Sequence, residues 1–430
     1  MSLGKKITFG VGAGALCVLV DGGCALVNIH ILLKFITPAE AGYWLLIIAC
    51  GGFLMQGQAA LGPTITRRVA QNAWSDAAGK GVSPRIAGCA TLVLIASATM
   101  TYVGYLASRT PDEESPKYLL SWFLYVIGLA LNLNAALKFA QINGYGEIVW
   151  EKACRIVVSI FGVLGNLIAL IADCGLLGLA FVFLLQGLLT MFAASKLLTF
   201  HTSSARSLGL ETHSETRGLM LDAIKLLSLG VMGYLVVNAG TFIVEFRFGP
   251  EAVSQYVPLI RVGAILSTIS ILIPQAVFPF VARAWAIGDG ITHRRLFMAG
   301  VWFSLSVYLT SALSLIAFAD SVVPTWIGPD RYLGSQFLLL VLVAFAISTA
   351  NVAHTSPIIA SRGNAFIGPS IVNLILVVTL LWYLTGWLGL VGAPLAVIIG
   401  SILPSGWVIW QSYGLVYNLG KGASSGTSVG

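Results

Sequence analysis

The residues of this chain that could do chemistry are a few polar side chains inside long apolar segments. Asp21 and Arg261 are charges that lie deep in such segments. A charge near the middle of a bilayer costs at least about 2.5–3.5 kcal/mol on insertion scales, so it usually marks a binding or ion pathway. A carboxylate there can take up a proton or a cation, or accept hydrogen bonds from a sugar. A guanidinium can hold a phosphate group through two parallel hydrogen bonds.

Both charges also have a structural interpretation. Asp21 shares a helical face with Asn28, seven residues on, and a neighbouring helix could pair with either side chain. Arg261 could form an ion pair with Asp21 or Glu245 that stabilises one conformation, and an incoming phosphate could then displace the carboxylate. The residue spacing leaves both interpretations open.

Other polar residues interrupt neighbouring apolar segments. Asn238, Thr241 and Glu245 form a stripe along one expected helix, and they are candidates for substrate contact. Glu245 could instead cap the outer end of that helix near Arg247. Gln56 and Gln58 lie among small residues, which could equally indicate close helix packing.

A basic cluster lies near the inner ends of the expected fourth and fifth spans. Lys138, Lys152 and Arg155 are typical of side chains that extend toward the membrane surface, or they could line an inward-facing entrance.

Apolar helices must position all of these residues. The 430 residues are 57% hydrophobic and 10% charged, with a mean hydropathy of +0.90, which is outside the usual range for a soluble domain. Segments of roughly 20 to 28 residues can each cross about 30 Å of hydrocarbon. The sequence therefore predicts an all-α integral membrane protein with twelve transmembrane helices, at 7–33, 42–66, 84–108, 118–141, 148–171, 175–198, 221–246, 253–281, 295–318, 333–353, 365–385 and 389–413.

The distribution of charge predicts the orientation of these helices. With both termini in the cytoplasm, most of the 24 basic residues fall on the cytoplasmic side, as the positive-inside rule requires. The net charge of +7 then faces anionic membrane lipids, so it gives no reason to expect a nucleic-acid partner.

Loop motifs repeat along the chain at a spacing of about 215 residues. The matched segments are Pro38–Tyr43 with Pro250–Tyr256, Pro63–Arg67 with Pro279–Arg283, and Gly175–Gly178 with Gly389–Gly392. An even number of helices in each repeat predicts two parallel, pseudo-symmetric six-helix bundles around a central cleft. The expected parts are an N-terminal lobe at 1–200, a cytoplasmic linker at 201–217, a C-terminal lobe at 218–415 and a flexible cytoplasmic tail at 416–430.

Four loop motifs resemble one membrane protein family. They are Pro-x-Glu-x-Gly-Tyr-Trp from Pro38, Leu-Gly-Pro from Leu61, Trp326-Ile327-Gly328-Pro329, and Gly-Leu-x-Gly from Gly175 and from Gly389. Together they resemble the Wzx-type oligosaccharide flippases of the MOP (multidrug/oligosaccharidyl-lipid/polysaccharide) superfamily, up to about Tyr417. The resemblance implies a MATE-like fold in a bacterial inner membrane, with helices 1, 2, 7 and 8 lining the cavity.

The resemblance also implies a function and partners. The expected function is to flip polyprenyl (undecaprenyl) pyrophosphate-linked oligosaccharides from the cytoplasmic to the outer leaflet by alternating access, for O-antigen, capsule or exopolysaccharide assembly. A polysaccharide polymerase and a chain-length regulator are expected partners. An ion-coupled drug or metabolite antiporter of the same superfamily stays open, as does a membrane enzyme of envelope polysaccharide assembly.

Motifs for other chemistry are missing from the sequence. It contains no GxxxxGK[ST] phosphate loop, no GxSxG or HExxH motif, and no Cys/His spacing for a metal. We therefore expect no enzymatic activity, no cofactor and no metal. Transport would take its energy from an H+ or Na+ gradient or from the membrane potential.

Overall fold

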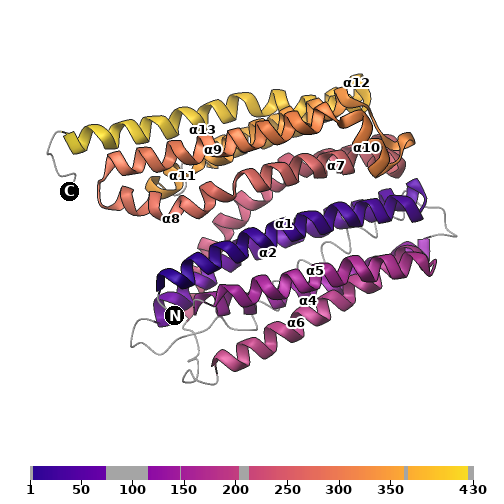
Figure 1. The fold of residues 1–430 in the computed structure, drawn as a ribbon, viewed down its shortest axis with the longest axis horizontal. Coiled ribbons are helices and arrows are strands. Elements are labelled where there is room, and N and C mark those ends of the chain that lie inside the picture. The colour runs from indigo at the N-terminus through magenta and orange to yellow at the C-terminus, as the bar shows by residue number, and fades with distance from the viewer. Residues whose placement is uncertain (1–2, 74–114, 146, 203–212, 363–366, 425–430) are drawn as a thin grey trace. The chain divides into compact units, whose positions relative to one another are not determined.

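The structure is a computed structural model that describes residues 3–73, 115–145, 147–202, 213–362 and 367–424 (Figure 1). Every regular element in these ranges is a helix, and nine stretches of them are long and apolar enough to cross a membrane. Two of these stretches, 230–270 and 367–417, each contain two predicted spans, and the predicted span at 84–108 lies outside the described residues. The chain is therefore an all-α, multi-pass membrane protein, as predicted.

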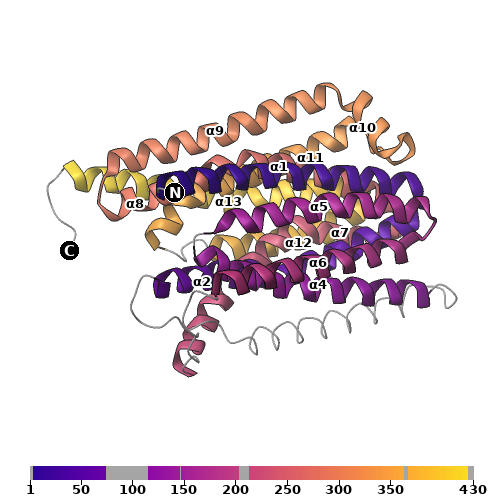
Figure 2. The ribbon, with the colours of Figure 1, turned by 60° about the horizontal axis from the view of Figure 1, so that its bottom comes forward.

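The chain divides into two units, Met1–Tyr234 and Leu235–Gly430. The first unit contains α1 (Leu3–Phe35), α2 (Pro38–Ala73), α4 (Ser115–Gly144), α5 (Ile148–Ile171), α6 (Gly175–Thr202) and the start of α7 (His213–Ser270). In it α4 packs against α6 and α2, and α5 packs against α1 and α6. Figure 2 shows α1, α4, α5 and α6 with their long axes aligned.

The second unit begins within α7 and contains the remaining helices. These are α8 (Leu272–Ala286), α9 (Gly290–Ala317), α10 (Ala319–Ile327), η1 (Pro329–Arg331), α11 (Ser335–Arg362), α12 (Ile367–Leu388), η2 (Gly389–Val391) and α13 (Gly392–Ser424). In this unit α13 packs against α11, α12 and α9, and α8 packs against α9 and α11.

Glycines with positive φ close the turns that the sequence repeat predicts. The chain reverses within α7 at Gly249, with φ 82°, and Pro250 follows in the first turn of the next helical segment. This is a conformation that residues with a Cβ rarely adopt, and proline is tolerated where the missing N–H has no helical partner. Gly175 and Gly389, at matching positions of the two repeats, both have positive φ as well, at 53° and 62°. The repeat is therefore present in the backbone as well as in the sequence.

The predicted domain boundaries stay a prediction. The described helices end at Thr202 and resume at His213, so 203–212 of the predicted linker lies outside the described residues. At the other end α13 continues to Ser424, into the segment predicted as a tail, and 425–430 lie outside the described residues.

Candidate functional site

A line of polar side chains joins α1 to α5 in the first unit. Ser159 donates a hydrogen bond of 2.6 Å from Oγ to Oδ1 of Asp21, and Asn166 donates one of 3.0 Å from Nδ2 to Oδ1 of Asn28. Both pairs are 138 residues apart in sequence, so the two helices run in the same direction and keep one register. Seven residues separate the two contacts on each helix, the repeat with which parallel helices pack in coiled coils.

The Asp21 carboxylate uses both of its oxygens in this contact. Besides Ser159 on Oδ1, Oδ2 lies 2.9 Å from Nε of Arg155 and 3.6 Å from the Cys17 thiol. The arrangement matches the structural interpretation of Asp21, a carboxylate paired with a neighbouring helix. Its predicted roles in binding substrate or a coupling ion stay predictions, as does the role of Asn28.

The predicted entrance lysines each have a local partner. Lys152 lies 3.2 Å from a Glu151 oxygen, and Asn143 donates a hydrogen bond of 2.6 Å to the other oxygen of that carboxylate. Lys138 donates a hydrogen bond of 2.7 Å to Ser195 on α6. Lys152 and Arg155 are three residues apart on α5, so they share one side of that helix.

The small residues around the predicted glutamines on α2 are packing positions. Gln56 donates a hydrogen bond of 3.2 Å to the Gly52 carbonyl of its own helix, and the side chain of Gln58 lies outside the described residues. A Cβ added at Gly52 would lie 2.6 Å from the Tyr234 hydroxyl, and one added at Gly51 would collide with Tyr125. Both glycines therefore admit tyrosine side chains close to the backbone of α2.

Arg261 lies in the second unit, on the part of α7 that follows the Gly249 reversal. Among the residues that the structure describes, no hydrogen bond or ion pair joins its guanidinium, which is partly buried. The Asp21 carboxylate that could pair with it is held by Arg155.

The predicted stripe before the reversal in α7 is mostly buried. Thr241 and Glu245 are 3% and 5% exposed, and Asn238 and Glu245 both have polar partners. Their predicted contact with substrate stays a prediction.

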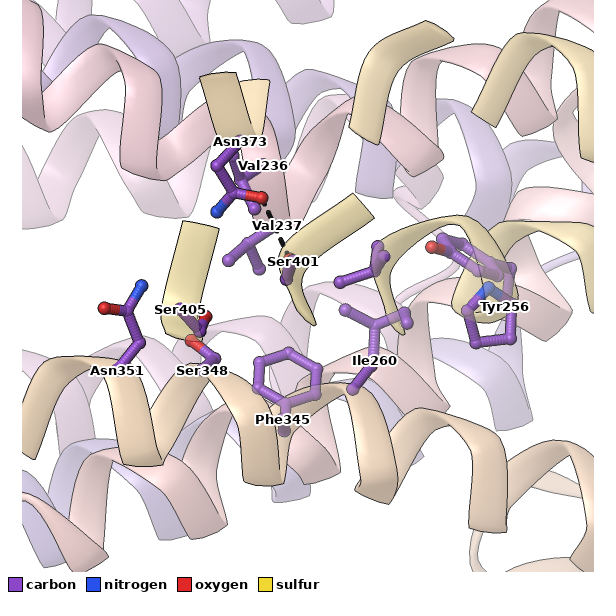
Figure 3. Close-up of a pocket in the computed structure, with 13 residues that line it drawn as sticks. Val236, Val237, Tyr256, Ile260, Phe345, Ser348, Asn351, Asn373, Ser401 and Ser405 are labelled. Atoms are coloured by element: carbon purple, nitrogen blue, oxygen red, sulfur yellow. Dashed lines mark hydrogen bonds between the residues drawn. The ribbon is translucent and has the colours of Figure 1, made fainter. Parts of the chain in front are cut away.

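The second unit also holds a cavity, lined by apolar residues and a few polar side chains, that the sequence did not predict (Figure 3). Its volume is about 40 Å³, room for about three or four water molecules at roughly 10–15 Å³ each. Ser401 donates a hydrogen bond of 3.0 Å to Oδ1 of Asn373, while Oδ1 of Asn351 and Oγ of Ser405 have no partner among the described residues. Unpartnered buried polar atoms of this kind are usually satisfied by water.

The signal for this cavity was present but weak. Ser401 and Ser405 are one turn apart on α13, and Ser348 and Asn351 are one turn apart on α11. Serine is common at helix interfaces in membranes, so this spacing alone does not predict a cavity. Within the described residues, no group of three or more His, Cys, Asp or Glu side chains could hold a metal ion.

Comparison with known proteins identifies the fold. Neither a protein-family model nor a curated protein sequence matches this chain. Among solved structures, it is similar to an inward-facing multidrug resistance MATE transporter of the MOP superfamily, with a TM-score of 0.73 and 12% identity over 95% of this chain and 99% of that one. It is also similar to a mutant of the MATE transporter VcmN from Vibrio cholerae, with a TM-score of 0.68 and 14% identity over 96% and 98% of the two chains.

A third similar structure is a MOP superfamily transporter from Pyrococcus furiosus, whose binding pocket is described as having a reverse polarity that suggests a different function. Its TM-score is 0.67, with 12% identity over 96% of each chain. These likenesses show that the chain has the MATE-like fold of two pseudo-symmetric helical bundles.

Proposed function

We propose that this protein is an alternating-access transporter that moves an anionic, lipid-linked substrate from the cytoplasmic to the outer leaflet. More specifically, we propose that the substrate is a polyprenyl-pyrophosphate-linked oligosaccharide used in surface polysaccharide assembly. The protein would lie in a bacterial inner membrane with both termini in the cytoplasm. The fold supports transport, because the similar structures are transporters of the MOP superfamily in which inward-facing and outward-facing conformations are known. The loop motifs that resemble those of Wzx-type flippases support a lipid-linked oligosaccharide as the substrate.

The observation that supports an anionic substrate is the positive charge of Arg261 inside a membrane span. Asp21 and Arg261 lie deep in described spans, and Arg155 lies about two turns inside the start of its span. Arg155 lies 2.9 Å from the Asp21 carboxylate, and the buried Glu245 has an interaction of its own, whereas no hydrogen bond or ion pair among the described residues joins Arg261. An uncompensated cation inside a membrane span is costly, and a phosphate group offers it a bidentate partner.

A cation exporter is the second candidate. Two observations favour it: similar structures are described as multidrug resistance transporters, and α1 carries the deep carboxylate Asp21. Against it, Ser159 and Arg155 already occupy that carboxylate. No observation on the described residues favours the third candidate, a membrane enzyme of envelope polysaccharide assembly. Coupling to an H+ or Na+ gradient or to the membrane potential, and association with a polymerase or a chain-length regulator, are parts of the proposal that need their own tests.

The test is translocation by the purified protein in liposomes. A short-chain polyprenyl-pyrophosphate sugar with a fluorescent label would be placed in one leaflet and its transfer followed by quenching from the other side. We expect Arg261→Ala to slow transfer at least about tenfold, because charge-assisted hydrogen bonds contribute about 1.5–3 kcal/mol, and Arg261→Lys to keep part of the rate.

Arg295→Ala is the matched control, because that side chain is exposed near the start of α9. Transfer by Arg261→Ala at the rate of the control would contradict the role of Arg261. A protein that moves organic cations but no lipid diphosphate would replace the flippase with the second candidate.

A further inference from the structure

The guanidinium of Arg155 is held on one edge and open on the other. Its Nε lies 2.9 Å from Oδ2 of Asp21, and its two terminal nitrogens have no partner among the described residues. The side chain is 57% exposed, whereas that of Asp21 is 27% exposed. The free edge carries the two parallel N–H groups that bind a phosphate or carboxylate in bidentate geometry.

Arg155 lies on the polar side of α5. Most of the large apolar residues that α5 leaves exposed lie along one face: Trp150, Val157, Ile160, Leu164, Ile168 and Ile171. At 100° per residue this face is centred on the side of the helix opposite Arg155. Ile148, at the start of the helix, lies on the other face. The face that includes Arg155 also carries Ser159 and Asn166, the two contacts to α1. A helix with these two faces turns its apolar side to hydrocarbon and its polar side to the protein interior or to water.

Asp21 and Ser159 prevent Arg155 from moving freely. The carboxylate is itself fixed by the 2.6 Å hydrogen bond from Ser159 and by the thiol of Cys17, so it presents Oδ2 to Nε from a fixed place. An arginine oriented by a carboxylate in this way loses less side-chain entropy when it binds a second anion.

Lys152 can add a second positive charge to the same side of α5. It lies 3.2 Å from Glu151, and that carboxylate has another donor in Asn143 at 2.6 Å. Glu151 would therefore keep a hydrogen bond if Lys152 turned toward an anion one helical turn away, beside Arg155.

From these contacts we infer that Arg155 and Lys152 form an oxyanion site of the first unit, which binds a phosphate or diphosphate group through the terminal edge of Arg155. Asp21 is the positioning residue of this site. The inference rests on the proposed function for the natural source of the anion, the diphosphate of the substrate. The headgroup of an anionic phospholipid is the other source of the same chemistry.

The test is titration of the full-length protein with inorganic pyrophosphate, in nanodiscs of zwitterionic lipid, by isothermal calorimetry. All measurements use the Arg261→Ala background, so that the guanidinium of Arg261 does not contribute. We expect binding that Arg155→Gln weakens at least about tenfold and Arg155→Lys weakens less, because lysine keeps the charge and loses the fork. Lys196→Gln, on the exposed side of α6, is the control and should leave the affinity unchanged.

Arg155→Gln leaves Asp21 without its cation and could impair folding, so the double variant Asp21→Asn/Arg155→Gln provides the same test with both charges removed. Repeating the titration in nanodiscs that contain anionic phospholipid separates the two sources. Pyrophosphate binding that survives there indicates a substrate diphosphate, and binding that is lost indicates a lipid headgroup.

The absence of pyrophosphate binding to the Arg261→Ala protein would overturn the site. An affinity for pyrophosphate within twofold of that protein in both Arg155→Gln and Asp21→Asn/Arg155→Gln would also overturn it. This result can be told apart from failure of the proposed function. If the protein translocates the lipid-linked sugar but substitution of Arg155 leaves pyrophosphate binding unchanged, only the site is refuted. Arg155-dependent binding without translocation would refute the flippase alone.

Discussion

The ion pair between Asp21 and Arg155 should stabilise the contact between α1 and α5 by a measurable coupling energy. The perturbation is a double-mutant cycle with Asp21→Asn, Arg155→Gln and the double variant, each of which keeps the approximate shape of its side chain. Such a cycle isolates the pairwise term from the separate effect of each substitution.

The size of the coupling follows from the distance and the exposure of the two side chains. Two unit charges 2.9 Å apart attract by about 1.4 kcal/mol at the dielectric constant of water and by about 6 kcal/mol at an effective value of 20. The side chains are 57% and 27% exposed, so screening and desolvation reduce the larger figure substantially. We expect a coupling of about 1–3 kcal/mol, above that of a surface pair.

The assay is equilibrium unfolding in mixed micelles, with a rising fraction of denaturing detergent and helix content as the signal. A second cycle of Asp21→Asn with Lys196→Gln is the control, because the exposed Lys196 lies over Phe192 of its own helix α6 and has no described ion pair with Asp21. That cycle should give no coupling beyond about 0.5 kcal/mol, the usual limit of additivity for distant sites. A coupling of the same small size in the first cycle would refute the ion pair and would make Arg155 a side chain that only extends toward the membrane surface.

Two further predictions concern helix packing and pH. Gly187→Ala should destabilise the first unit by about 1–3 kcal/mol in the same unfolding assay, because the new Cβ would lie 2.6 Å from the Gly128 carbonyl oxygen and force α4 and α6 apart. Gly233→Ala, which meets nothing within 4 Å, should be neutral or stabilising, and equal losses at the two positions would contradict the packing argument. Burial and the hydrogen bond to Asp320 raise the pKa of the Tyr332 phenol from 10.0 to about 12. Because the folded protein holds this proton more tightly, its stabilising effect is complete below about pH 10 and is lost as the pH rises to about 12. Thermal stability measured across that range should fall less in Tyr332→Phe than in the unchanged protein, and identical pH profiles would count against the contact.

The positions of the spans and turns could be predicted from the sequence because they depend on neighbouring residues. A helix that crosses hydrocarbon must be apolar along its whole length, so composition alone locates it. Gly249 with Pro250, Gly175 and Gly389 mark reversals for local steric reasons, and the structure has positive φ at all three glycines. The repeat, and with it the two-bundle architecture, was predicted from these same local signals.

The partners of the polar side chains could not be predicted in the same way. The sequence singled out Asp21 as a costly charge inside a span, with pairing to a neighbouring helix as one interpretation, but it assigned Arg155 to a separate cluster at the entrance. The two residues meet because α1 and α5 pack in parallel with a register of 138 residues, which also brings Asn166 to Asn28.

What the sequence determined by itself is therefore the membrane class, the spans, their turns and the residues that are costly to place in hydrocarbon. Only the tertiary structure decided which of these residues meet. In it both oxygens of the Asp21 carboxylate have partners, the terminal edge of Arg155 is open, and a cavity lies beside Asn351 and Ser405. The physical reason is that helices with apolar surfaces on all sides can rotate and slide past one another with little change in hydrophobic energy. Their relative rotation and register are set by close packing and by hydrogen bonds between residues far apart in the chain.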